Sequence, residues 1–89
     1  MIKKEVTIIN KLGLHARAAA KFVTVASRFE AEISVSRGDR NVNGKSIMGI
    51  MMLAASKNTT ITLTITGIDE EQATTAICEL IANRFDEPE

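Results

Sequence analysis

The sequence predicts an α+β fold, an open-faced sandwich in which a four-stranded antiparallel sheet carries three helices on one face. Residues 60–66 alternate threonine with isoleucine or leucine, which is typical of a sheet that is wet on one face and packed on the other. Strand and helix patterns follow each other in the order β-α-β-β-α-β-α, and a short turn joins the two middle strands. The helical connections can therefore return to the same face of the sheet.

In the first half of the chain, a β-branched run at residues 6–9 begins the strand signals. A helix is predicted over residues 16–27, where the apolar residues that form one stripe are Ala19, Phe22, Val23 and Ala26. Residues 32–36 alternate apolar and polar side chains, as a half-buried strand does. The Gly-Asp pair at residues 38–39 predicts a hairpin turn into a short strand over residues 40–43.

In the second half, Ser46 is a good N-cap for a helix over residues 47–53. After the strand at residues 60–66, a third helix follows Asp69, and Gln72 is placed as the return partner of a capping box. The stripe predicted to be buried on this helix comprises Ala73, Ala76, Ile77, Leu80 and Ile81. We expect a single domain over residues 1–85 and an acidic tail at residues 86–89 that frays.

Composition limits the classes of function. The 89 residues fit one domain with a small core, and equal numbers of basic and acidic side chains favour neither nucleic acid nor a membrane surface. The single cysteine, Cys78, cannot form an internal disulfide, which fits a reducing compartment. We find no leader or membrane-length apolar run and expect a cytoplasmic monomer without a cofactor. The lone histidine also makes a metal site unexpected.

That histidine, His15, lies where the first strand pattern gives way to an alanine-rich helical pattern. It could simply end a loop and cap a helix. However, a helix N-terminus presents unpaired amides and positive dipole charge, which favour a bound phosphoryl group. The backbone amides of Ala16, Arg17 and Ala18 could bind its oxygens, and the guanidinium of Arg17 adds a planar fork of donors. With no nearby residue to activate water, this set suits a carrier better than a hydrolase.

The segment GLHAR at residues 13–17 resembles the phosphorylation motif of the HPr family, the histidine-containing phosphocarriers of the bacterial phosphoenolpyruvate-dependent phosphotransferase system. KSIMG at residues 45–49 and GIDE at residues 67–70 match as well, and the resemblance covers nearly the whole chain. It implies that His15 accepts a phosphoryl group on its tele nitrogen, Nε2, from phosphorylated enzyme I. His15 would then donate the group to the A-type domain of a sugar permease, with Arg17 as its partner in the active centre.

One residue departs from the family's pattern, because Ala18 stands where proline is usual. Alanine keeps good helix propensity and restores an amide donor, but it loses the preset φ of proline. We expect a working site whose helix start is slightly less fixed. The effect should fall on transfer rate and on partner preference.

Ser46 has two interpretations. Its residue type predicts an N-cap, whereas the resemblance implies a site for HPr kinase/phosphorylase, as in some lineages. A phosphate at a helix N-terminus is tolerated by a fold, yet it would add about two negative charges to a surface that meets partners. The phosphorylated form could therefore weaken docking or contact a transcriptional regulator.

The helix over residues 47–53 carries more apolar side chains than one core can take. We expect some of Ile47, Met48 and Met51 to be exposed beside His15, since surplus methionine suits a surface that binds several partners. A fully buried helix is the alternative from pattern alone. The resemblance implies a docking surface on the first two helices, which Lys21 and Lys45 could frame with positive charge.

Other functions stay open at this point. The carrier could serve sugar uptake or the parallel nitrogen-related branch, whose carrier looks similar. A regulatory binding module that signals through Ser46 belongs to a different class. A small acylphosphatase-like hydrolase would need a glycine-rich anion loop with an asparagine near an arginine, and the sequence holds no such arrangement.

Overall fold

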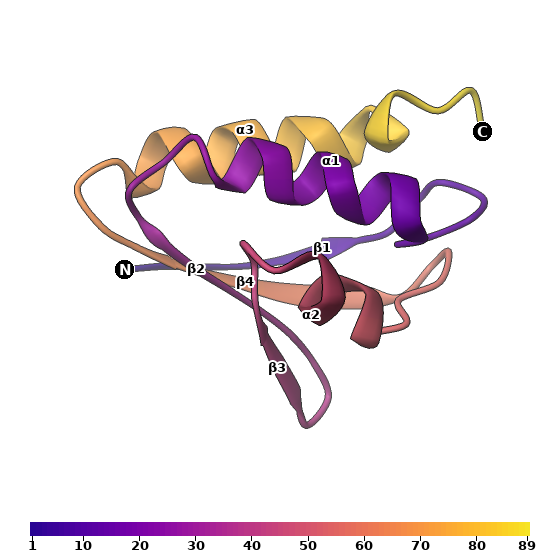
Figure 1. The fold of residues 1–89 in the computed structure, drawn as a ribbon, viewed down its shortest axis with the longest axis horizontal. Coiled ribbons are helices and arrows are strands. Elements are labelled where there is room, and N and C mark those ends of the chain that lie inside the picture. The colour runs from indigo at the N-terminus through magenta and orange to yellow at the C-terminus, as the bar shows by residue number, and fades with distance from the viewer.

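The computed structural model describes all of residues 1–89 as a four-stranded sheet with its helices on one face (Figure 1). The elements are β1 (Ile2–Thr7), α1 (Ala16–Ala26), β2 (Glu32–Arg37), β3 (Arg40–Asn43), α2 (Ile47–Met52), β4 (Thr60–Thr66), α3 (Glu70–Ala82) and a 3-10 turn η1 (Arg84–Asp86). The predicted fold class and element order are confirmed. Both α1 and α2 end one residue earlier than predicted, and β1 begins and ends earlier than residues 6–9. None of the helices is both long and apolar enough to cross a bilayer.

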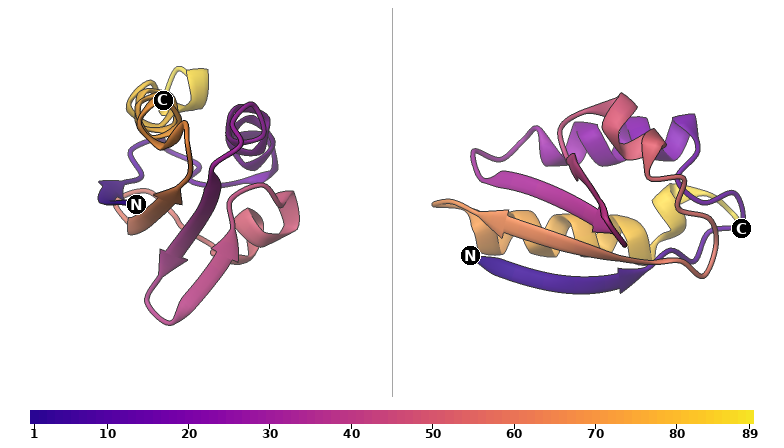
Figure 2. Two further views of the ribbon diagram at one scale, coloured as in Figure 1. Left: turned by 90° about the vertical axis from the view of Figure 1, so that its left-hand side faces the viewer. Right: turned by 90° about the horizontal axis from the view of Figure 1, so that it is seen from below.

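The strands lie in the order β1-β4-β2-β3, and every neighbouring pair is antiparallel. Val35 of β2 lies opposite Val42 of β3 on one side and Leu63 of β4 on the other. Figure 1 shows α1 and α3 side by side over the sheet, and the end-on view of Figure 2 shows α2 on the same side, next to α1. The other face of the sheet carries no helix, as its threonines predict.

The core lies between this sheet and the helices. The apolar face of β4 is buried through Ile61, Leu63 and Ile65, while the threonines between them are half-buried and those at the two ends of the strand are exposed. Two residues of the predicted helical stripes, Val23 and Ala76, are only half-buried because they lie at the edges of their stripes.

The start of α3 differs from the predicted capping box. The carboxylate of Asp69 accepts hydrogen bonds from the backbone amides of Glu30 at 2.8 Å and Ala31 at 2.9 Å. It therefore binds the loop that follows α1. It makes no bond to its own helix, and Gln72 is exposed. The side chain that the pattern assigned to a local cap therefore joins two segments distant in sequence.

The chain turns sharply after α3. Arg84, Phe85 and Asp86 have φ values of 56°, 53° and 63°, a left-handed conformation that costs about 1–2 kcal/mol for each residue with a Cβ. The Phe85 side chain is fully buried, and its carbonyl oxygen accepts a hydrogen bond of 2.9 Å from Nζ of Lys21. Burial of the ring offsets the cost of the turn and directs the following residues toward the start of α1.

Candidate functional site

The loop between β1 and α1 fixes the position of His15. Gly13 has φ +66°, and a Cβ there would lie 2.5 Å from the carbonyl oxygen of Ala55, so only glycine fits. The amide of Leu14 donates to that same oxygen at 2.9 Å, and the Leu14 side chain is buried. His15 follows as the N-cap residue of α1, with extended backbone, and its carbonyl oxygen accepts a hydrogen bond from the amide of Ala19.

The first turn of α1 offers the donors that the sequence predicts. The amides of Ala16, Arg17 and Ala18 make no hydrogen bond in the structure, and the His15 side chain does not cap them. Because α1 begins at Ala16, these amides point out of the helix end, where the dipole is positive. They form a set of donors suited to an anion.

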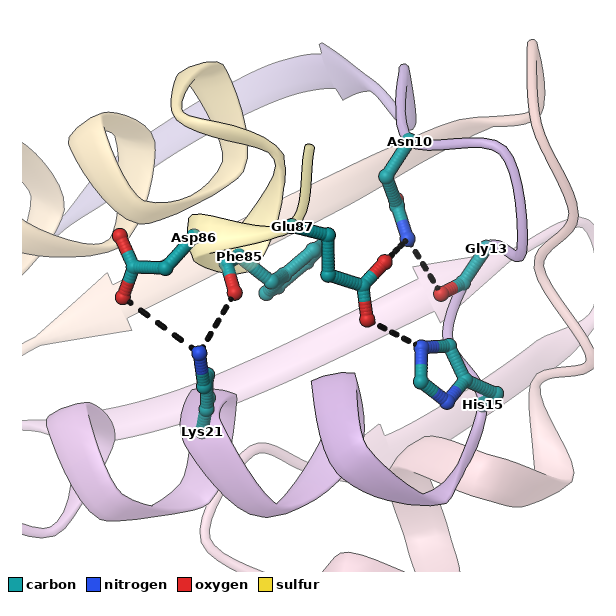
Figure 3. Close-up of polar contacts among 7 residues, drawn as sticks. All are labelled: Asn10, Gly13, His15, Lys21, Phe85, Asp86 and Glu87. Carbon is teal, nitrogen blue, oxygen red and sulfur yellow. Dashed lines mark hydrogen bonds and ion pairs between the residues drawn. The ribbon is translucent and has the colours of Figure 1, made fainter. Parts of the chain in front are cut away.

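The His15 ring is partly exposed, with 28% of its side chain accessible. Its Nε2 atom is bonded to Oε2 of Glu87, a residue of the acidic tail (Figure 3). The second ring nitrogen, Nδ1, lies on the opposite side of the ring, toward α1. The Nε2 atom that the resemblance suggested as phosphoryl acceptor is thus engaged, and Nδ1 is the nitrogen that carries no bond to protein.

Glu87 is held by two partners. Its Oε1 atom accepts a hydrogen bond of 2.9 Å from the side-chain nitrogen Nδ2 of Asn10. Asn10 is fully buried, and its Nδ2 also donates to the Gly13 carbonyl oxygen at 2.8 Å. Burial opposes ionisation of Glu87, but the hydrogen bonds from the Asn10 side chain and from His15, together with the nearby charge of Arg17, lower its pKa below the ordinary value. Glu87 is therefore a carboxylate near neutral pH.

The rest of the tail also contacts the domain. The backbone amide of Lys11 donates to the Glu89 backbone oxygen at 3.0 Å. Nζ of Lys11 also lies 3.3 Å from the side-chain carboxylate of Glu89. The Asp86 carboxylate lies 3.6 Å from Nζ of Lys21. Residues 86–89 thus lie against the site instead of extending away as a frayed end, because the turn at η1 and the buried Phe85 direct them there.

Arg17 is exposed and makes no hydrogen bond or ion pair within the chain. It lines a shallow pocket whose other residues are Lys11, Leu12, Glu87, Pro88 and Glu89. His15, Arg17 and the free amides thus all lie at the N-terminal end of α1.

The start of α2 confirms the N-cap interpretation of Ser46, whose Oγ accepts a hydrogen bond of 3.1 Å from the amide of Gly49. The expected exposure is also confirmed: Ile47, Met48 and Met51 are exposed, whereas Ile50 of the same helix is fully buried. Met52 of the same helix is exposed as well, and so is Leu12 in the loop before α1.

The two lysines have different contacts from those expected. Nζ of Lys21 bonds to the Phe85 carbonyl oxygen, and Nζ of Lys45 donates to the carbonyl oxygen of Phe29 at 2.7 Å. Both ammonium groups satisfy backbone oxygens near the ends of helices instead of standing free around α2.

Asn10 and Glu87 belong to the site and were missed by sequence reasoning. Glu87 lies 72 residues beyond His15 in the chain, and no local pattern links the two. A polar Asn10 directly after an apolar run was the one available signal, because a buried amide must find partners.

Comparisons with known proteins show the family of this chain. A family model described as the PTS HPr component phosphorylation site matches residues 2–83. Phosphocarrier protein HPr of Pseudomonas aeruginosa is 58% identical over 86 residues, 96% of each chain. That of Cupriavidus necator is 53% identical over 89 residues, the whole of both chains.

Solved structures of HPr proteins are also similar to this chain. HPr-C-His from Thermoanaerobacter tengcongensis superposes with a TM-score of 0.96 at 45% identity, covering all of both chains. A structure named as an HPr dimer from the same organism gives a TM-score of 0.79 at 46% identity, over 98% of this chain and all of the other. The expectation drawn from residues 13–17 is confirmed: the chain belongs to the HPr family of phosphotransferase-system phosphocarriers.

Proposed function

We propose that this protein carries a phosphoryl group on His15, accepting it from phosphorylated enzyme I and passing it to the A-type domain of a sugar permease. It acts as a substrate of these partners and turns over nothing alone. The observation that carries the proposal is the place of His15 at the start of α1, beside free amides and the unpaired Arg17. Family membership supports the carrier role.

The acceptor atom in this proposal is Nδ1 in place of Nε2. Nε2 is bonded to Glu87, whereas Nδ1 lies on the side of the ring that faces α1 (Figure 3). In the transfer step the Nδ1 lone pair forms the new N–P bond while the bond from phosphorus to the donor's leaving group breaks. The reverse sequence at a downstream partner regenerates the free ring.

The helix end and Arg17 would stabilise the transferring group. The amides of Ala16, Arg17 and Ala18 have no competing acceptor, so they can bind phosphoryl oxygens without breaking an existing bond. The exposed guanidinium of Arg17 can add charge-assisted hydrogen bonds to the same oxygens. Ala18 would contribute an amide that the family's usual proline lacks.

Partners would dock on the exposed apolar patch of α2, formed by Ile47, Met48, Met51 and Met52. Exposed thioethers repack easily, which suits a carrier that meets its donor and its acceptors with one surface. Lys21 and Lys45 would add positive charge at the margin of the contact once a partner competes for their ammonium groups. We place these encounters in the cytoplasm, with the carrier a monomer that holds no metal or other cofactor.

Ser46 is proposed as a regulatory site for HPr kinase/phosphorylase. Its Oγ caps α2 directly before the docking patch, so a phosphate there would put negative charge at the edge of that patch. The phosphorylated form would dock more weakly to enzyme I and could contact a transcriptional regulator. Equal turnover by enzyme I of wild-type protein and Ser46→Asp would contradict this role.

The direct test is to incubate the protein with enzyme I and phosphoenolpyruvate and to measure its mass. The proposal predicts one added phosphoryl group that is lost in mild acid and is absent from His15→Ala. No added mass in the wild type, or the same addition to His15→Ala, would overturn the assignment.

The nitrogen-related branch is the second candidate. One relative, phosphocarrier protein NPr of Shewanella violacea, is 45% identical over 86 residues. Relatives named HPr reach 58% identity, which favours the sugar branch. Faster phosphorylation by the nitrogen-branch enzyme I than by the sugar-branch enzyme I would reverse this preference.

A further inference from the structure

The tail that follows α3 reaches the reacting histidine through a chain of hydrogen bonds. Asn10 is fixed by the Gly13 carbonyl oxygen, Glu87 is fixed by Asn10, and the His15 ring is bonded to the second oxygen of Glu87 (Figure 3). Nδ2 of Asn10 has two hydrogens, one for Gly13 and one for Glu87, and the two oxygens of Glu87 serve Asn10 and His15 separately, so the contacts do not compete. The ring of His15 is thereby held from the side opposite to α1.

Contacts with the folded domain fix the path of the tail. Phe85 is fully buried, its carbonyl oxygen accepts from Lys21, and Asp86 lies near the same ammonium. These contacts hold the left-handed turn from Arg84 to Asp86, which non-glycine residues rarely adopt. The turn, which is held by the buried Phe85 ring and by Lys21 of α1, thus places Glu87 beside His15.

We propose that Glu87 is a positioning residue for phosphoryl transfer at His15: its carboxylate holds Nε2–H of the ring and leaves Nδ1 as the reacting nitrogen. A carboxylate can only accept, so the bonded Nε2 must carry the proton and the lone pair then lies on Nδ1. This inference rests on the proposed function, and it adds the group that orients the ring.

The contact between Glu87 and His15 also affects the phosphorylated form of the ring. When Nδ1 forms the N–P bond and Nε2 keeps its proton, the ring becomes a cation, and the Glu87 carboxylate is its counter-charge. Release of the phosphoryl group to a partner returns the ring to its neutral form, and no proton has to leave Nε2. The pairing therefore supports loading and unloading of the same nitrogen.

Other charges surround the ring. Arg17, in the first turn of α1, lines the same pocket as Glu87, while Lys11 pairs with Glu89 in the tail and Lys21 pairs with Asp86. Of the carboxylates, Glu87 is the one bonded to His15. Glu89 makes a matched control, because it lies in the same tail and carries the same charge but contacts Lys11.

The test compares Glu87→Gln and Glu87→Ala with Glu89→Gln. The first measurement reads the tautomer of the neutral His15 ring by ¹⁵N NMR in mildly alkaline solution, in the free protein without any partner. Glu87→Ala removes the acceptor of Nε2–H, so its neutral ring should shift toward the tautomer mixture of an unpaired imidazole. Glu87→Gln keeps an acceptor oxygen and should change less, and Glu89→Gln should match the wild type.

The second measurement is the rate of phosphorylation by enzyme I, which we expect to fall about tenfold in Glu87→Ala and to stay unchanged in Glu89→Gln. Circular dichroism verifies that each variant is folded. An unchanged tautomer balance and rate in Glu87→Ala, or equal changes in Glu89→Gln, would overturn the positioning role. A wild-type His15 that takes no phosphoryl group would instead refute the proposed function itself.

Discussion

Nζ of Lys21 donates a hydrogen bond to the carbonyl oxygen of Phe85 at 2.9 Å, which joins the middle of α1 to the turn that follows α3 (Figure 3). The Phe85 ring enters the core at the same point. The segment that carries Glu87 is thus part of the folded domain, and the site depends on residues from both ends of the chain.

Phe85→Ala should lower the free energy of unfolding by about 3–5 kcal/mol, because it removes a fully buried aromatic ring and leaves a cavity. Urea denaturation measures the change. Phe85→Leu fills most of the cavity and should lower the free energy of unfolding by clearly less. A loss below 1 kcal/mol in Phe85→Ala would mean that the ring is not part of the core in solution.

Arg84→Gly should raise the free energy of unfolding by about 0.5–1 kcal/mol. Arg84 is exposed and has φ 56°, a conformation that glycine adopts without the steric cost of a Cβ. Asn83→Gly is the matched control, since Asn83 has φ −89° and gains nothing from glycine. Equal destabilisation by both substitutions would show that residue 84 is not held in the left-handed region.

Stability should fall as the solution becomes acidic, partly through Glu87. Its pKa is lower in the folded protein than the ordinary value of about 4.3, so the folded state binds the proton less tightly than the unfolded state does. The stabilisation from this group is therefore complete above about pH 5 and is lost as pH falls through the folded pKa.

Measurements of the unfolding free energy from pH 7 to pH 3 should give a shallower decline for Glu87→Gln than for the wild type. The remaining slope belongs to groups such as Asp69, whose pKa is lowered by the hydrogen bond from the Glu30 amide. Parallel curves for the two proteins would contradict the pairing of Glu87 with His15 in solution.

Met48→Glu should impair docking without unfolding the domain. The side chain is 69% exposed on α2, so stability should change by no more than about 0.5 kcal/mol. We expect the KM of enzyme I for the carrier to rise about tenfold, because a charge would enter an apolar contact. Ile68→Glu is the control, since Ile68 is 89% exposed in the loop between β4 and α3. An equal rise in KM for both variants would remove α2 as the docking surface.

Most of the fold follows from periodicity in the sequence. The alternation in β4 predicts its buried Ile61, Leu63 and Ile65, and helical spacing predicts the burial of Phe22 in α1. Ser46 behaves as its residue type predicts because an N-cap is a local contact between a side chain and an amide three residues later.

What could not be predicted depends on contacts between distant segments. Asp69 serves the loop at residues 30–31 and not its own helix, and Glu87 reaches His15 across 72 residues. The turn at Arg84–Asp86 has no glycine to mark its positive φ angles, so the tail appeared from sequence to be a frayed end. Burial of Phe85 fixes the path of the tail, and this burial depends on the assembled core instead of on local sequence.

The central claim is that His15 carries the phosphoryl group on the nitrogen facing α1. The most direct measurement is an NMR spectrum of the protein labelled with ¹⁵N in histidine, after reaction with enzyme I and phosphoenolpyruvate. We predict a one-bond coupling between phosphorus and Nδ1 of His15, with a proton retained on Nε2. Coupling to Nε2 would contradict the choice of nitrogen, and a phosphorylated protein without any coupling to the ring would contradict the account as a whole.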